Sequence, residues 1–314
     1  MRGVANLRNF DTEAYPIDLG DGITISGRSQ RELTSLGFDD AVWQRITDDW
    51  RMGGASSFVL IAESSVAKEP NNLIFVDSYT PLLKATRAMS ALRLIGEGSV
   101  SIGPMWVVRP ARFDVGVGGG LRQSGISFPV FGSRYTCGDK VQSSYPLIYA
   151  ALAKLESEGY GKSPGNLSVA LRSFMGTYDR WPPQNDWQLL ELITALEAVL
   201  GISSELTFRL SFRVASLLAS NDGERTYLLT LVREFYDTRS TIIHGSTLGT
   251  KHRALLARLD ELRTLVRKLL KALVIFAAGP SSAYYTKGFW SKQFDAALLD
   301  ANEREKLRAE LGLR

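Results

Sequence analysis

Residues 234–245 read Glu-Phe-Tyr-Asp-Thr-Arg-Ser-Thr-Ile-Ile-His-Gly, and this stretch decides how the C-terminal half of the chain is organised. It predicts a helix that ends at Gly245, because glycine readily adopts the left-handed backbone conformation that closes helices. Arg239 and His244 stand just before that end, and the chain has only two histidines. An imidazole can carry protons near neutral pH, and a guanidinium can hold developing negative charge.

The spacing of Arg239 and His244 limits how the two side chains can act together. Residues five apart on a regular helix lie roughly 140° from each other around the helix axis. Either the helix unwinds between them, or a working site combines side chains from two copies of the chain across a two-fold interface. The simpler interpretation is a surface cation followed by an imidazole that caps the helix.

Helical periodicity extends over most of the chain after Pro146, and Gly, Pro and Asn residues divide it into segments. The expected helices span residues 147–158, 167–178, 187–200, 205–218, 225–244 and 251–277. The last helix carries apolar residues at alternating steps of four and three. Such a pattern predicts packing on other helices or a dimer seam, here through Leu255, Leu259, Leu262, Val266, Leu269, Leu273 and Phe276.

The run from Arg239 to Gly245 resembles the Arg-x(4–6)-His signature of the HEPN superfamily, in the Arg-Ser-x-x-x-His-Gly form of its Apea-like branch. The preceding segments are similar to the helices that come before this signature, through Leu190, Leu196, Glu197, Arg209, Arg213 and Leu218. The resemblance covers less than a third of the chain, and the position of the motif among helical segments adds to its specificity. It implies a HEPN-like helical bundle at residues 141–280 that forms a homodimer.

The resemblance also implies two candidate functions. Active members of the superfamily are metal-independent ribonucleases, and others are noncatalytic modules for RNA binding or protein assembly. In an active site of this type, His244 would act as general acid or base and Arg239 would bind the phosphate, while the 2′-hydroxyl of RNA attacks. Ser240 would orient one of them, at a position where many active members carry Asn or Asp. A toxin or an antiviral defence effector is one setting for such an enzyme.

A basic segment follows the Arg/His motif. Residues 251–271 contain seven Lys or Arg against two acidic residues, a net charge of +5 in a chain whose total is +4. A polyanion such as RNA could lie along it, although a solvated helix face is the plainer interpretation. The expected RNA-binding residues are Lys251, Arg253, Arg258, Arg263, Arg267 and Lys271. His252 is expected to be a surface residue, and Asp237 to pair with Arg233 one helical turn earlier.

The N-terminal region, residues 1–140, is expected to form a mixed α/β domain, which makes the fold class α+β. Residues 57–62 and 105–108 have strand character. Helices are expected at residues 38–50 and from Thr80, where Thr80 can cap and Pro81 suits the first turn. Residues 116–142 are rich in Gly and Ser and predict a loop or a connection between domains. This domain could bind a ligand or a regulatory partner and control the helical half.

The remaining features favour a cytoplasmic protein without cofactors. The single cysteine, Cys137, cannot form an internal disulfide, and no Cys/His cluster predicts a metal site. The Gly116-x-Gly118 sequence lacks the third glycine of a nucleotide-binding loop. No apolar run is long enough to span a membrane. Residues 281–314 are expected to form an aromatic and charged tail with one helix from Phe294 to about Leu311, which more readily anchors onto the bundle than binds bases.

Overall fold

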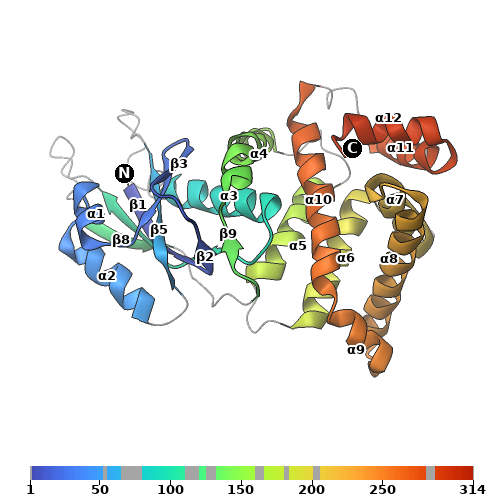
Figure 1. The fold of residues 1–314 in the computed structure, drawn as a ribbon, viewed down its shortest axis with the longest axis horizontal. Coiled ribbons are helices and arrows are strands. Elements are labelled where there is room, and N and C mark those ends of the chain that lie inside the picture. Colours follow the sequence, from blue (N-terminus) through green and yellow to red (C-terminus); the bar gives the residue numbers. More distant parts are fainter. Residues whose placement is uncertain are drawn as a thin grey trace. The chain divides into compact units, whose positions relative to one another are not determined.

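The computed structural model describes residues 2–51, 55–64, 80–109, 120–124, 132–159, 166–179, 184–200, 206–280 and 287–313. The chain divides into two compact units, Met1–Tyr149 and Ala150–Arg314. The first contains the strands, and the second is helical (Figure 1). The fold is therefore α+β, with an N-terminal sheet and a C-terminal helical region, as the sequence predicts at this level.

The described part of the first unit is built on an antiparallel sheet in the order β3-β4-β5-β1-β7-β8, with β6 paired to β1 at its side. Strand β1 lies at its centre and is buried along most of its length, although its sequence is only partly apolar. The strands of this sheet are β1 (Arg2–Arg8), β3 (Ile17–Gly20), β4 (Ile23–Gly27), β5 (Ala55–Glu63), β6 (Ser101–Ile102), β7 (Met105–Arg109) and β8 (Gly120–Ser124). The strand predictions at 57–62 and 105–108 are confirmed by β5 and β7.

Helices cover both faces of this sheet. On one face, α1 (Gln30–Ser35) and α2 (Asp40–Arg51) pack on β1 and β5, in a core that includes Val4, Ile46 and Ile61. On the other face lies α3 (Thr80–Ile95). Gly3 permits the close approach of α3, because a Cβ at this position would stand 3.0 Å from the Cβ of Pro81. The predicted helices at 38–50 and from Thr80 are confirmed.

The Gly- and Ser-rich stretch 116–142 is not simply a connection between domains. Strand β8 pairs with β7, and β9 (Tyr135–Thr136) forms a small parallel pair with β2 (Phe10–Asp11). Asn9 helps to hold this pair, because its side-chain amide donates to the carbonyl oxygens of Ser99 and Ser133. These contacts join residues about a hundred positions apart in the chain, so local composition could not show them. Residues 116–119 and 125–131 lie outside the described residues.

The second unit is a set of packed helices. They are α5 (Leu167–Asp179), α6 (Asn185–Leu200), α7 (Leu206–Leu218), α8 (Asp222–Ile243), α9 (Thr250–Leu256) and α10 (Leu259–Ala278), and α4 (Asp139–Ser157) contains the boundary between the units. The predicted apolar repeat from Leu255 to Phe276 is buried, at 0–7% exposure. It packs on α5, α6 and α7 within the chain, so the interpretation as a core face is confirmed.

Most helix boundaries agree with the sequence predictions within three residues, and three helical segments differ more strongly. Helix α4 begins at Asp139 and continues through Pro146, eight residues earlier than expected. The predicted helix 251–277 is two helices, with a break at Ala257 and Arg258 where neither glycine nor proline marks it. The tail also forms two helices, α11 (Lys287–Leu299) and α12 (Ala301–Glu310). Asp300 separates them, because its carboxylate accepts from the backbone N–H groups of Asn302 and Glu303.

Arg213 of α7 joins the tail to the preceding helices. This arginine is 2% exposed, donates to Leu200 O and to Asp295 Oδ1 of α11, and lies over the ring of Phe294. Residues 281–286, which include two of the tail's tyrosines, lie outside the described residues. Among the helices that the structure describes, none combines the length and apolar character needed to cross a bilayer.

Candidate functional site

The end of α8 exposes His244 on a well-defined turn. His244 is the C-cap residue, and Gly245 follows with a φ of 68°, in the left-handed region. The N–H of Gly245 donates to Ile242 O, and the N–H of Ser246 donates to Thr241 O. This pair of hydrogen bonds is a Schellman motif, which satisfies the last carbonyl groups of a helix. The prediction that Gly245 ends the helix is confirmed, and the His244 side chain is exposed.

Arg239 is held by residues from two helices. Its Nη2 lies 3.4 Å from Glu197 Oε2 of α6, and its Cζ lies 5.6 Å from the ring centroid of Tyr236. The side chains of Arg239 and Glu197 are 25% and 20% exposed. Burial raises the pKa of the Tyr236 phenol, and the neighbouring Glu197 carboxylate raises it further. Glu197 was singled out in the sequence only through the resemblance, and the i, i+3 spacing of Tyr236 and Arg239 is the local signal for their contact.

The helix does not unwind between Arg239 and His244. Helix α8 is regular through Ile243, and the N–H of His244 still donates to Ser240 O. The two side chains therefore leave α8 in different directions, roughly 140° apart. Ser240 precedes His244 by four residues and shares its face of the helix. The structure thus brings Ser240 and His244 to one face, and places Arg239 beside α6 instead.

Three of the seven cations in the basic segment form ion pairs within the chain. Lys251 lies 3.0 Å from Glu234, although its side chain remains 75% exposed. Arg258 contacts both Glu261 and the hydroxyl of Tyr227, and this carboxylate raises the pKa of Arg258. Arg263 pairs with Asp260 and donates to Gln188. Cations that are already paired attract a polyanion less strongly.

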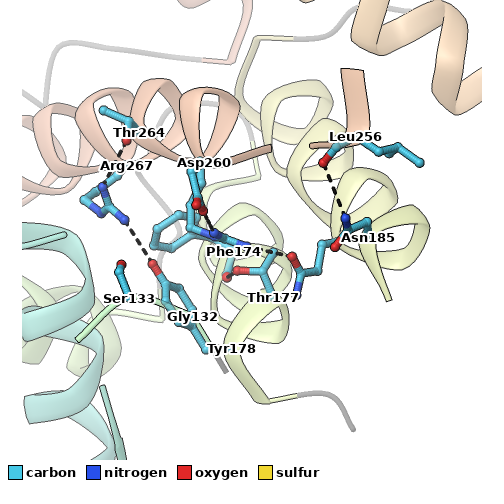
Figure 2. Close-up of polar contacts among 12 residues, drawn as sticks. Gly132, Ser133, Phe174, Thr177, Tyr178, Asn185, Leu256, Asp260, Thr264 and Arg267 are labelled. Carbon is cyan, nitrogen blue, oxygen red and sulfur yellow. Dashed lines mark hydrogen bonds and ion pairs between the residues drawn. The ribbon is translucent and has the colours of Figure 1, made fainter. Parts of the chain in front are cut away.

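Arg267 does not lie on an exposed face, contrary to the expectation of an RNA-binding role. It is 7% exposed and donates to the hydroxyl of Tyr178 and to Thr264 Oγ1 (Figure 2). Nearby, the side-chain amide of Asn185 donates to the carbonyl oxygen of Leu256, which ties α6 to α9. Of the remaining predicted cations, Arg253 is exposed on α9 and Lys271 is half-buried on α10.

His252 is more than the surface residue expected from the sequence. It is half-buried, and its Nδ1 lies 3.0 Å from Thr238 Oγ1 of α8. The Thr238 hydroxyl donates its proton to Glu234 O at 2.9 Å. Because this hydroxyl proton is directed at Glu234 O, the contact favours the His252 tautomer that carries its proton on Nδ1 and donates it to the Thr238 oxygen. This contact joins the start of α9 to the face of α8 next to Arg239.

Arg233 does not form the predicted ion pair with Asp237. Its Cζ instead lies 5.6 and 5.5 Å from the ring centroids of Phe208 and Phe212 on α7. Phe208 is 49% exposed, and Asp237 is also exposed. The i, i+4 spacing of two phenylalanines was the sequence signal for this aromatic pair, but their partner on another helix could not be read from it.

No protein-family model, curated protein or solved structure significantly matches the chain. In the part of the chain that the structure describes, no three His, Cys, Asp or Glu side chains are grouped so that they could hold a metal ion.

Proposed function

We propose that this protein is a metal-independent endoribonuclease of HEPN type, with His244 and Arg239 as its catalytic residues. The observation that carries the proposal is the state of these two side chains. His244 is exposed on the hydrogen-bonded turn that ends α8. Arg239 contacts Glu197 and Tyr236, and its side chain stays partly exposed. Both chemical needs of RNA transesterification, a proton carrier and an oriented cation, are present.

The reaction uses a nucleophile that RNA itself supplies. The 2′-oxygen attacks the adjacent phosphorus, its proton passes to a base, and the bond from phosphorus to the 5′-oxygen breaks as that oxygen takes up a proton. The products are a 2′,3′-cyclic phosphate and a 5′-hydroxyl end. His244 exchanges protons with the reacting oxygens, and the Arg239 guanidinium binds the phosphoryl oxygens.

Arg239 keeps hydrogen-bond donors for a phosphate. Glu197 engages Nη2 at 3.4 Å, which is long for a charged hydrogen bond. The Nε of Arg239 is buried and has no hydrogen-bond partner among the described residues. A phosphate would therefore reach the guanidinium through the Nη groups of this partly exposed side chain, beside Glu197. Ser240, on the face of His244, would orient the imidazole or the scissile group.

The regular helix between the two residues leads to a composite site. Arg239 and His244 point in different directions from the same helix. We therefore assign each catalytic site to two copies of the chain, with Arg239 from one copy and His244 from the other. A homodimer then carries two equivalent sites. The partly neutralised basic segment contributes mainly through Lys251 and Arg253, which are the most exposed of the predicted cations on α9.

The decisive test is cleavage of labelled single-stranded and structured RNA in excess EDTA. Wild type should yield cyclic-phosphate ends, whereas His244→Ala and Arg239→Ala should lose at least about 100-fold in rate, since each removes a main catalytic interaction. Lys306→Ala, which removes an exposed cation of α12 outside the pair and outside the basic segment, is the control and should leave the rate unchanged. Absence of cleavage by wild type, with RNA still bound, would favour a noncatalytic RNA-binding module. Activity lost in EDTA would point to a metal enzyme.

A further inference from the structure

An aromatic pair with a stacked arginine lies on the surface formed by α7 and α8. Phe208 and Phe212, one turn apart on α7, place their ring centroids 4.4 Å apart with the planes tilted by 42°. Arg233 of α8 lies over both rings. Phe208 is 49% exposed, so much of its ring faces solvent. We call Phe208, Phe212 and Arg233 the aromatic platform.

The platform carries a positive charge that forms no ion pair among the described residues. The contacts of Arg233 within the described parts of the chain are with the two rings, and no carboxylate there forms an ion pair with it. This differs from Arg258 and Arg263, which are both paired with acidic residues. A guanidinium is planar and charged, and one held beside aromatic rings can stack on a nucleobase.

The platform lies on the same face of α8 as His244. Arg233, Asp237, Ser240 and His244 follow one another at steps of four, three and four, which places them along one stripe of a helix. Because α8 is regular throughout, Arg233 and His244 are separated by about 16 Å along its axis. That length matches roughly five stacked nucleotides at about 3.4 Å each, and fewer in an extended strand.

We propose that the aromatic platform binds an unpaired nucleobase of single-stranded RNA and so selects unpaired RNA for cleavage at His244. The choice of RNA as ligand rests on the proposed ribonuclease function. Stacking on Phe208 and Arg233 accepts any base, because every base has an aromatic face. The platform therefore distinguishes single-stranded from double-stranded RNA and does not distinguish sequences, because bases within a duplex are not available to stack on protein side chains.

Asp237 fixes how the strand lies on this stripe. Its exposed carboxylate stands between Arg233 and Ser240 and repels phosphate groups. The strand therefore turns its bases, not its phosphates, toward α8 at this point. A second protein chain could also use exposed phenylalanine and arginine as contact residues. The open charge of Arg233 and its alignment with His244 favour RNA.

The test uses short RNA that cannot be cleaved, so that binding is read independently of catalysis. An oligonucleotide with 2′-O-methyl groups and one 2-aminopurine, a fluorescent adenine analogue, is titrated with the full-length protein. Wild type should quench the fluorescence through stacking. Phe208→Ala should weaken binding about 10-fold, as expected for one stacked base, and Phe208→Tyr should stay within about twofold of wild type because it keeps the ring. Trp187→Ala, at an equally exposed aromatic residue of α6 (46%), is the control and should bind as wild type.

Further arms separate the possible outcomes. Asp237→Asn should strengthen binding by removing the repulsion, and duplex RNA should bind without any effect of Phe208→Ala. Equal binding by Phe208→Ala and wild type would overturn the proposal. If light scattering shows that Phe208→Ala changes a dimer into a monomer, the platform is a protein interface, and the proposal is also overturned. Binding with the expected stacking but without cleavage of normal RNA would leave the platform standing and remove the nuclease function alone.

Discussion

The Nη2 of Arg239 lies 3.4 Å from Glu197 Oε2, which joins the arginine of the candidate site to a neighbouring helix. This carboxylate has two opposing effects on a phosphate ligand. It fixes the direction of the guanidinium, which favours catalysis, and it neutralises part of the positive charge, which disfavours RNA binding. The two effects can be separated experimentally.

Glu197→Gln should therefore tighten RNA binding several-fold and lower the cleavage rate at saturating RNA about 10-fold, because orientation is lost while charge is gained. Fluorescence anisotropy gives the first quantity, and single-turnover cleavage gives the second. Asp222→Asn removes a carboxylate from an exposed ion pair at the opposite end of α8 and serves as control. If both quantities remain unchanged in Glu197→Gln, the ion pair has no part in the site.

Gly245→Ala should destabilise the second unit by about 1–2 kcal/mol, because alanine must adopt a left-handed conformation there. An added Cβ at this position meets nothing within 4 Å, so the backbone alone accounts for the cost. A change in this turn should also displace the neighbouring His244 and so lower the cleavage rate. Gly249→Ala, at a φ of −73°, is the matched control and should cost little. Chemical denaturation measures both variants, and equal stabilities would contradict the Schellman motif.

Thr238→Val should remove the preference of neutral His252 for carrying its proton on Nδ1. In wild type, this tautomer is favoured because the Thr238 hydroxyl proton is directed at Glu234 O and the hydroxyl oxygen accepts from the ring. Valine removes that acceptor with little change in shape. With two histidines in the chain, nitrogen chemical shifts of the imidazoles report the change directly. Thr241→Val alters a hydroxyl that bonds within α8 and is the control. An unprotonated Nδ1 in neutral wild-type His252 would refute the assignment.

The buried Cys137 thiol should make the free energy of unfolding fall at alkaline pH. Burial raises the pKa of its thiol from 9.0 to about 11 in the folded protein. A raised folded pKa means that the unfolded chain loses this proton first. The contribution to stability is therefore complete below pH 9 and is lost as the pH rises through about 11. Cys137→Ala should reduce the fall in unfolding free energy over this range. The native thiol should also react with disulfide reagents about 100-fold more slowly than in the unfolded chain at pH 8.

Local sequence patterns predicted the helices of the second unit well. Neighbouring apolar residues in the repeat from Leu255 to Phe276 are one helical turn apart, and the glycine after His244 ends the helix locally. Both signals depend on residues close in sequence, so the helices could be predicted from them. The break at Ala257 was not marked by a helix-breaking residue, and it was missed. Strand β1 was missed as well, because its central place depends on β5 and β7, which follow it at a distance in sequence.

The candidate site was predictable only in part, for the same reason. The positions of Arg239 and His244 at a helix end came from spacing and from the glycine. The partner of Arg239 lies 42 residues away in the sequence, and that of Arg267 lies 89 residues away. A run of cations predicts a charged surface, but only long-range packing decides that Arg267 is buried against Tyr178.

Mixing two inactive variants shows whether Arg239 of one copy and His244 of another cleave RNA together. Arg239→Ala and His244→Ala are each purified, mixed, and assayed on RNA in EDTA after subunit exchange. Random mixing makes half the dimers mixed, and each mixed dimer has one intact composite site, so activity should recover to about a quarter of wild type. A mixture as inactive as its two parents, beside an active wild type, would show that the two residues do not act across a dimer.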